Sequence, residues 1–338
     1  MWYNEKKRTG SDATVTQRLA ENLKTKLPLR FRRDGSFKIL MLSDYQETID
    51  FDERTLRGTR AIVRATAPDL ILLGGDMPGV PKPETPADLR AYLDVLVGAF
   101  GGVPFCHVYG NHDYDIGFPV TEATAVYEAI PTCLSKHVPG IHGETNYVLP
   151  ILASDGDDVR FAVWGLDTGN RIESFRAGIT DEARPEGHPT VIGPWDGIRF
   201  DQEMWYWNSS CELEAYAGHK VPALMAMHVA PWEITNLQTS PAGTGAVGAS
   251  AERYNLSAFN SGIFFTALQR GDVSCIASGH THENDCCGTY CGITLCNVGS
   301  AGYAAYGIDE RRGGRLFTLR EETPGKIKTE MVYYKDHV

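Results

Sequence analysis

The sequence lacks long apolar runs and an excess of basic residues. No stretch approaches the ~18 consecutive apolar residues expected of a membrane helix, and the first thirty residues carry many charges where a signal peptide would be apolar. Its 43 acidic residues outnumber its 32 basic ones, giving a net charge of −11, whereas a general nucleic-acid binder normally has a basic face. We expect a cytoplasmic protein that neither spans a membrane nor binds nucleic acid. The negative net charge does not exclude a small anionic substrate, because bound cations reverse the charge of a site.

Cysteine is present, but not in a pattern typical of a disulfide framework. The eight cysteines include no CxxC pair, and without a signal peptide they are expected to be reduced thiols, several of them in strands. A structural zinc site is the less favoured alternative for the cluster formed by Cys286, Cys287, Cys291 and Cys296.

Short apolar runs alternate with helical segments in the first third of the chain. The runs cover residues 37–42, 69–73 and 104–109, and residues 52–67 and 85–100 between them have helical character. This order is typical of an α/β fold with parallel strands. Chain length permits one large domain or two smaller ones.

The rest of the chain divides into further strands and two irregular segments. Strands are predicted at 147–152, 160–166, 221–227, 273–277, 293–298 and 315–319. Short glycine-rich turns after Gly292 indicate an antiparallel meander there. Residues 169–210 and 234–262 have no regular pattern, which is typical of active-site surroundings or disorder. Residues 1–36 are predicted to be an N-terminal extension with an amphipathic stretch at Val15, Leu19, Leu23 and Leu27.

Polar residues gather just after the predicted strands, where ligands bind in open α/β sheets. They are Asp44, Asp76, Asn111, His112, His228, His280 and His282. Carboxylate, amide and imidazole ligands together suit Mn²⁺, Fe or Zn²⁺. Each residue also has a simpler interpretation. Asp44 alone can cap a helix, Asn111 alone can occupy a turn, and His228 alone can be a core histidine.

These residues form motifs that resemble those of the calcineurin-like metallophosphoesterases, in the branch similar to purple acid phosphatases. The motifs are GGD at 74–76, GNHD at 110–113, MH at 227–228 and GHTH at 279–282. The resemblance implies one domain over residues 37–338, with an α/β fold in which a two-sheet β-sandwich is flanked by helices, in four αββα layers.

The resemblance also implies roles for single residues. Asp76 would bridge two metal ions, Asn111, His228 and His280 would complete one site, and Asp44 and His282 would belong to the other. His112 would contact the phosphate or protonate the leaving oxygen, and Asp113 would orient its ring.

The first motif departs from the family pattern. The family has Asp-x-His, whereas this sequence has Asp44-Tyr45-Gln46. An amide oxygen is a weaker and harder ligand than imidazole, so a metal at Gln46 is expected to bind loosely and to favour Mn²⁺. Purple enzymes carry a ligand tyrosine where this chain has Gly79, so no purple colour is expected unless Tyr45 takes that role.

The implied activity is that of a dinuclear metal-dependent phosphoesterase, in which a metal-bound hydroxide attacks a small phosphorylated substrate. Phosphomonoesters are the first choice and phosphodiesters the second. A degenerate, non-catalytic scaffold is the third alternative, because Gln46 replaces the usual histidine. Oligomeric state stays open.

Several other residues have weaker indications. Glu283 and Asp285 either orient the nearby histidines or form a solvated turn. Trp195, Trp205 and Trp207 either wall the pocket or pack in the core, and packing is favoured. Three residues of the long loop could contact the substrate: Asn236, Arg253 and Asn260. His107, inside a predicted strand, is expected to be structural.

Overall fold

The computed structural model describes residues 26–172, 191–192 and 195–338, without the side chains of 191–192, and it contains two large sheets packed face to face. The seven-stranded sheet has the order β1-β5-β6-β8-β10-β12-β11, and the five-stranded sheet has the order β14-β13-β2-β3-β4. The strands of the first are β1 (Leu29–Arg30), β5 (Tyr147–Leu152), β6 (Val159–Gly165), β8 (Ala223–Met227), β10 (Val273–Ser278), β11 (Cys287–Tyr290) and β12 (Ile293–Asn297). Those of the second are β2 (Ser36–Leu42), β3 (Leu70–Leu73), β4 (Phe105–His107), β13 (Gly313–Arg320) and β14 (Lys328–Tyr333). A small parallel pair joins β7 (Val191–Ile192) and β9 (Asn255–Leu256).

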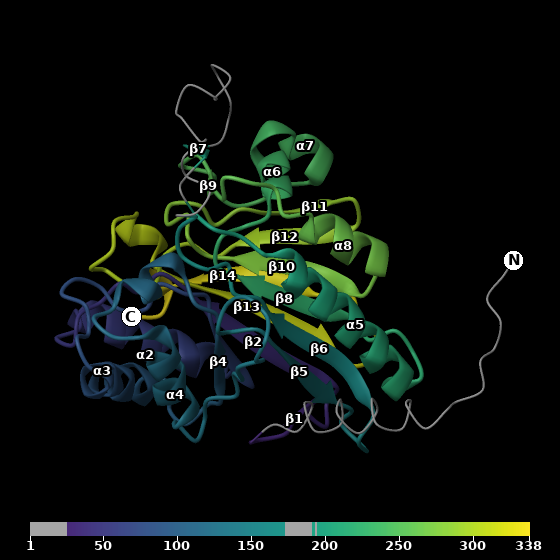
Figure 1. Ribbon diagram of the computed structural model, residues 1–338, viewed down its shortest axis with the longest axis horizontal. Coiled ribbons are helices and arrows are strands. Elements are labelled where there is room, and N and C mark those ends of the chain that lie inside the picture. The colour runs from purple at the N-terminus through teal and green to yellow at the C-terminus, as the bar shows by residue number, and fades with distance from the viewer. Residues whose placement is uncertain (1–25, 173–190, 193–194) are drawn as a thin grey trace, which may run out of the picture.

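Helices cover the outer face of each sheet. The five-stranded sheet is covered by α2 (Glu53–Thr66), α3 (Pro86–Gly98) and α4 (Val120–Glu128), and the seven-stranded sheet by α5 (Phe200–Ala217) and α8 (Ile263–Arg270). Figure 1 shows the two helix groups on opposite sides of the sandwich. Shorter helices are η1 (Asn111–Asp115), η4 (Trp232–Thr235), α6 (Asn236–Thr239), α7 (Pro241–Thr244), η5 (Asp309–Arg311) and η6 (Tyr334–Asp336). The four-layer αββα fold implied by the sequence resemblance is confirmed.

Strand β2 illustrates why the central strands are continuous apolar runs. Phe37, Ile39 and Met41 face the core between the sheets, and Leu40 and Leu42 face the helices. Side chains alternate between the two faces of a strand, and here both faces are buried. An apolar residue is therefore needed at almost every position.

The N-terminal boundary lies earlier than predicted. Leu29 and Arg30 form β1 and pair in parallel with Ile151 and Leu152 of β5, so residues 29–36 belong to the sandwich and not to an extension. The predicted amphipathic stretch lies outside the described residues except for Leu27, which is 40% exposed.

The predicted meander after Gly292 is wrong. Strand β12 pairs in parallel with β10 in one sheet, whereas β13 pairs antiparallel with β2 in the other. The connection between β12 and β13 crosses from sheet to sheet. The glycine-rich turns predict that another strand follows, but their composition does not indicate which sheet that strand joins.

Helix α5 lies partly inside a segment predicted to be irregular. Its buried positions are Gln202, Tyr206, Ser210 and Leu213, which recur with helical spacing. Because two of these four side chains are polar, the apolar stripe that identifies a helix is absent from the sequence. Among the helices of the described chain, none has both the length and the apolar composition needed to cross a bilayer.

Gly58 lies in the middle of α2, against the buried ring of Tyr334. A Cβ at this position would lie 2.4 Å from Tyr334 Cγ. Although Gly→Ala normally favours a helix, Gly58→Ala is expected to lower the free energy of unfolding by about 1–3 kcal/mol through overpacking. The control is Gly98→Ala at the end of α3, where a Cβ meets nothing within 4 Å. It should raise stability by about 0.4–1 kcal/mol. Urea midpoints followed by circular dichroism measure both, and an unchanged or raised midpoint for Gly58→Ala would contradict this packing.

Candidate metal centre

The predicted ligands lie together at one edge of the sandwich, because the strands that precede them end there. Asp44 follows β2, Asp76 follows β3 and Asn111 begins η1 just after β4 in the five-stranded sheet. His228 follows β8, and His280 and His282 follow β10, in the seven-stranded sheet. All five strands run parallel to a neighbour within their sheet. Their carboxyl ends therefore bring segments distant in sequence to one place.

One group of ligand atoms comes from Asp76, His228 and His280. One ligand atom from each lies within 4.8 Å of the others, and all three residues are buried. His228 Nε2 is 3.3 Å from Asp76 Oδ2. This spacing is compatible with a single cation held between the three side chains.

A second group lies beside the first. His282 Nε2 is 3.0 Å from Asp44 Oδ1, and the same oxygen is 4.0 Å from His228 Nε2. The two histidines of the GHTH motif thus approach different carboxylates, His280 with Asp76 and His282 with Asp44.

Buried polar atoms without partners indicate that this site is built for a cation. Both side-chain atoms of Asn111, Oδ1 and Nδ2, are buried and form no hydrogen bond within the described chain, and the same holds for His280 Nε2. An unpaired buried polar group costs about 1–3 kcal/mol, so native proteins rarely leave one without an ion or water. Imidazole nitrogen, amide oxygen and carboxylate are common ligands of first-row metals. The residues present fit a metal ion.

The backbone is strained at the same place. Four of the six non-glycine residues with positive φ in the described chain are Asp44, Gln46, Asp76 and His280. Such conformations cost on the order of 1–3 kcal/mol each and cluster at functional sites. Their concentration at the strand ends indicates that the geometry of these side chains is retained at the expense of stability.

Close packing explains two of the motif glycines. Gly75 has a φ of +98°, and a Cβ there would lie 2.6 Å from His228 Nδ1. A Cβ at Gly279 would lie 2.0 Å from Ser43 Oγ. Any larger residue at either position would push apart the loops that carry the candidate ligands.

Backbone carbonyls orient the histidines. His228 Nδ1 is 2.7 Å from Gly74 O, and His282 Nδ1 is 2.8 Å from Tyr306 O. The His282 ring also stacks on the Tyr306 ring, with centroids 3.9 Å apart. These contacts leave each Nε2 facing the carboxylates, as in many metal sites.

The alternatives considered for Asp285 are both wrong. Its carboxylate accepts hydrogen bonds from Ala249 N and from the Tyr333 hydroxyl, and it is buried. It therefore neither contacts a ligand histidine nor lies in a solvated turn. The Glu283 backbone N–H donates to Glu252 Oε1.

Charges in the site compensate one another. Burial would raise the pKa of Asp76, but the imidazoles of His228, His112 and His280 hold it well below its usual value. Burial would lower the pKa of His228, yet Asp76 and Asp44 raise it to about 10. Burial lowers the pKa of His280 to about 3, which leaves its ring neutral and able to bind a cation. A bound cation would take the place of the proton on His228 as the positive charge facing both carboxylates.

Gln46 lies at the position expected from the motif, with its Nε2 3.2 Å from Asp76 Oδ2. The amide as oriented donates to the carboxylate, and a half-turn about its last torsion would present Oε1 instead.

The positions that could supply a tyrosinate do not do so. A Cβ at Gly79 would lie 1.9 Å from Gln46 O, so a tyrosine does not fit there. Tyr45 is fully buried with its hydroxyl 2.9 Å from Thr59 Oγ1, and it belongs to the core beneath the helices.

The predicted role of Asp113 is wrong. Its carboxylate is buried and accepts hydrogen bonds from the backbone N–H groups of Asp76, Met77 and Gly110, so it ties two ligand loops together. The His112 ring instead places Nδ1 2.7 Å from Asp115 Oδ2. Asp113 immediately follows His112 and is turned toward the loops, whereas Asp115 lies three residues on in the tight helix η1.

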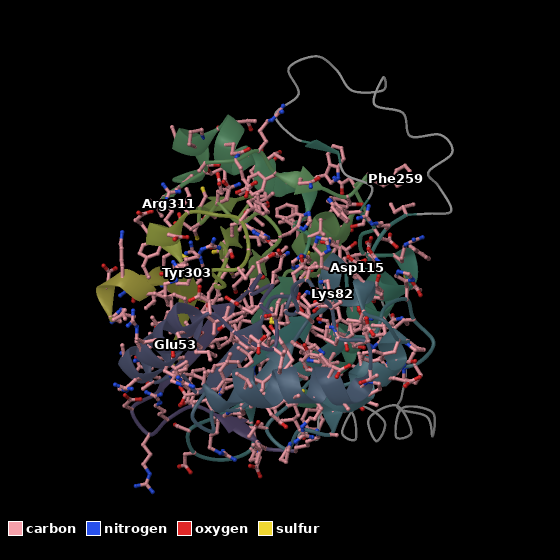
Figure 2. The ribbon with its side chains drawn as sticks, turned by 90° about the vertical axis from the view of Figure 1, so that its left-hand side faces the viewer. Glu53, Lys82, Asp115, Phe259, Tyr303 and Arg311 are labelled. Carbon is pink, nitrogen blue, oxygen red and sulfur yellow. The ribbon has the colours of Figure 1, made fainter. Side chains whose placement is uncertain are left out.

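His112 and Asp115 lie at the open side of the site. Their side chains are 36% and 35% exposed. Figure 2 shows Asp115 near Lys82, whose Nζ donates to His112 O at 3.0 Å. Sequence reasoning missed Asp115, although its spacing of three residues from His112 in a short helix was a usable signal.

Trp195 contributes to the wall of the site. Its ring centroid lies 6.1 Å from that of His112 and 5.3 Å from that of His280, edge-on to both. Trp205, in contrast, is partly buried and packs edge-on against the core residue Trp164. His107 is structural, stacked on Tyr127 with Nδ1 2.8 Å from Ser135 Oγ.

Two asparagines of the long loop 234–262 form their side-chain hydrogen bonds with Glu233 and not with a ligand residue, as far as the chain is described. Asn236 Nδ2 donates to Glu233 O and Asn260 Nδ2 to Glu233 Oε1. Arg253 lines a separate cavity of about 450 Å³ beside Glu252 and Cys286.

Comparisons with known proteins agree with this geometry. A family model described as calcineurin-like phosphoesterase matches residues 37–284. Probable inactive purple acid phosphatase 28 of Arabidopsis thaliana is 28% identical over 304 residues, which are 83% of this chain and 74% of that protein. Probable inactive purple acid phosphatase 14 of the same plant is 28% identical over 318 residues, 82% of this chain and 74% of that protein.

Two solved structures share the fold. A dimetal phosphatase from Danio rerio has a TM-score of 0.52 at 13% identity and covers 88% of this chain and 99% of its own. GAP50, described as the anchor in the inner membrane complex of Plasmodium, has a TM-score of 0.51 at 11% identity and covers 90% of this chain and 86% of its own.

The different contacts of Asp113 and Asp115 predict different effects on stability. Asp113→Ala removes the acceptor of three buried N–H groups and should lower the free energy of unfolding by about 2 kcal/mol or more. Asp115→Ala, at a half-exposed position, should change it by less than about 0.5 kcal/mol. Denaturant midpoints in the presence of EDTA, which removes any metal contribution, measure both. Equal effects of the two variants would contradict the contacts described.

Proposed function

Because this chain belongs to the calcineurin-like phosphoesterase family, we propose that it is a dinuclear metal-dependent phosphoesterase that hydrolyses phosphomonoesters of small molecules. One observation carries the proposal: His280 has a buried, unpartnered ligand atom where Asp76 and His228 meet, and so does Asn111, whose neighbour His112 donates its N–H to Asp76 Oδ1. A chain that had lost metal binding would have no reason to keep these atoms unpaired, because replacing them with apolar groups would stabilise it.

We assign the ligands to two cations. Asp76, His228 and His280, whose ligand atoms cluster, would hold one cation together with Asn111. Asp44 and His282, 3.0 Å apart, would hold the other, with Gln46 in place of the usual histidine. Asp76 would be the shared ligand, because it lies beside both His228 and Gln46. Mn, Fe or Zn suits the first set, and Mn²⁺ is favoured at Gln46.

The chain's own residues then assist hydrolysis of the ester. Two cations held by these ligands would supply the positive charge that stabilises the phosphoryl oxygens and activates water. His112, the most open ring of the site, contacts the phosphate or delivers a proton to the leaving oxygen. Asp115 fixes the orientation of that ring through Nδ1, which leaves Nε2 for the substrate. Trp195 restricts water on the side of His112 and His280.

The names of the relatives support phosphatase chemistry for the family, but they do not show that this chain is active. The Danio rerio structure is described as a dimetal phosphatase, whereas the Arabidopsis relatives are named probable inactive phosphatases. The choice between an active enzyme and a degenerate scaffold therefore rests on the ligand set of this chain, in which Gln46 is the departure. Phosphodiester hydrolysis uses the same centre and remains the second candidate activity.

Asp76→Asn tests the proposal. The wild type should bind two Mn²⁺ per chain when titrated and hydrolyse p-nitrophenyl phosphate. The variant weakens the shared ligand, and the cations contribute several kcal/mol to the transition state, so activity should fall by roughly 100-fold or more. Metal content is measured by mass spectrometry after desalting. The control Asp69→Asn lies at the other end of β3, in an ion pair with Arg32, and should keep metal and activity.

Other outcomes of this experiment have definite meanings. A wild type that binds no more than one metal and hydrolyses neither p-nitrophenyl phosphate nor its bis-ester is a degenerate scaffold. Hydrolysis of the bis-ester at a higher kcat/KM than the monoester would make the diesterase alternative correct. Full activity of Asp76→Asn with two metals bound would overturn the ligand assignment.

Gln46→His restores the family ligand and should strengthen the second site. We expect the wild type to be isolated with fewer than two metals per chain and to gain activity from added Mn²⁺. In the variant, the Mn²⁺ concentration for half-maximal activity should fall by roughly tenfold or more. Gln46→Ala is the matched control, and it should raise the Mn²⁺ concentration for half-maximal activity. If all three proteins behave alike, Gln46 is no ligand and a water molecule or another group takes its place.

A further inference from the structure

Three buried thiols lie on neighbouring strands at one end of the seven-stranded sheet. Cys275 is in β10, Cys296 in β12 and Cys287 in β11, which follow one another in the strand order. All three face the core between the sheets. The Sγ atoms of Cys287 and Cys296 are 2.8 Å apart, whereas those of Cys275 and Cys296 are 3.9 Å apart.

The register places Cys287 and Cys296 directly opposite each other. They are Cα partners in the antiparallel ladder of β11 and β12. The neighbouring pair carries the ladder bond from Asn297 N to Cys286 O, while the N–H and C=O of Cys287 bond to Val247 on the other side. Cys287 and Cys296 thus form a non-hydrogen-bonded pair, in which Cα atoms are about 4.5 Å apart and side chains approach closely. That separation lies within the range that a disulfide spans.

Cys275 has a less suitable relation to Cys296. In the parallel ladder of β10 and β12, Cys275 is opposite Thr294, and Cys296 is opposite Ala277. The two cysteines are therefore diagonal neighbours. Diagonal positions are about 7–8 Å apart, beyond the usual Cα separation of a disulfide.

We propose that Cys287 and Cys296 form a cross-strand disulfide when the protein meets a disulfide oxidant such as oxidised glutathione. The two thiols lose two protons and two electrons, one S–S bond forms between them, and the S–S bond of glutathione is reduced to two thiols. Cys287 reacts first through a mixed disulfide, and Cys296 then displaces reduced glutathione. This inference is independent of the proposed phosphoesterase activity.

Access depends on opening of the sheet edge. Strand β11 is the last strand of the seven-stranded sheet. In the described chain its outer side pairs only through the bridge between Val247 and Cys287, and the short helices α6 and α7 pack against it. Cys287 is 6% exposed and Cys296 fully buried. Burial raises the pKa of Cys296, so little thiolate forms in the closed sheet. Oxidation is expected to be slow and to accelerate where β11 frays.

The bond would join strands that hold the metal-centre loop. Asn297, next to Cys296, donates through Nδ2 to the carbonyls of Ser278 and Gly279, just before His280. Asp285, close to Cys287, ties the chain to Tyr333. The disulfide should therefore stabilise this end of the sandwich. The expected gain in melting temperature is about 5 °C.

Disulfide mapping tests the proposal directly. The full chain carrying Cys211→Ser and Cys291→Ser, which removes the two exposed thiols, is incubated with reduced or oxidised glutathione and then alkylated. No lysine or arginine lies between Arg270 and Arg311, so trypsin would leave the remaining cysteines of this region in one peptide. Digestion with Glu-C and chymotrypsin cleaves after Glu283 and Tyr290 and separates Cys287 from both Cys275 and Cys296. Oxidised samples should yield the Cys287–Cys296 cross-linked peptide and melt at the higher temperature.

Two further variants in that background identify the pair. Cys287→Ser should abolish both the cross-link and the oxidation-dependent rise in melting temperature. Cys286→Ser, the neighbour on the opposite face of the sheet, should change neither. Alkylation of both Cys287 and Cys296 after prolonged oxidation, including at a temperature just below unfolding, would overturn the proposal. A cross-link from Cys296 to Cys275 in preference to Cys287 would overturn it as well.

Discussion

The rest of the structure depends on the burial of two carboxylates beside three imidazoles. Asp44 and Asp76 are 0% and 1% exposed, and a buried charge without a partner is among the costliest features of a fold. Histidines from the opposite sheet supply the partners, and metal ions would supply the remaining charge. Left-handed backbone at Asp44 and Asp76 and glycines where the loops touch both serve to bring these groups together.

Such a site needs a rigid support. The sandwich provides it through three apolar layers, one between the sheets and one beneath each set of helices. Burial of that surface offsets the strain at the strand ends. Asp113 adds a local tie, because its carboxylate joins the loop after β3 to the loop after β4. The result is a site in which packing and hydrogen bonds hold the candidate ligand side chains in place.

The sequence predicted correctly those elements in which an apolar strand is directly followed by polar residues of a metal-binding motif. Strand β2 is a nearly continuous apolar run, and Asp44 lies just after it in a motif that recurs in family order with those at the later strand ends, so Asp44 could be identified together with its strand. Reasoning failed where the signal was not local. Gln202 and Ser210 interrupt the apolar face of α5, and the partner of His112 proved to be Asp115 because the turn of η1 directs Asp113 inward.

The sequence by itself determined the family, the layered α/β fold and the set of polar residues at the strand ends, because short motifs and apolar periodicity are local properties. Only the tertiary structure decided that β12 and β13 belong to different sheets and that Cys287 opposes Cys296. These are pairings between segments distant along the chain. They follow from strand register and crossover connections, which are set by how whole faces pack and not by any single stretch of residues.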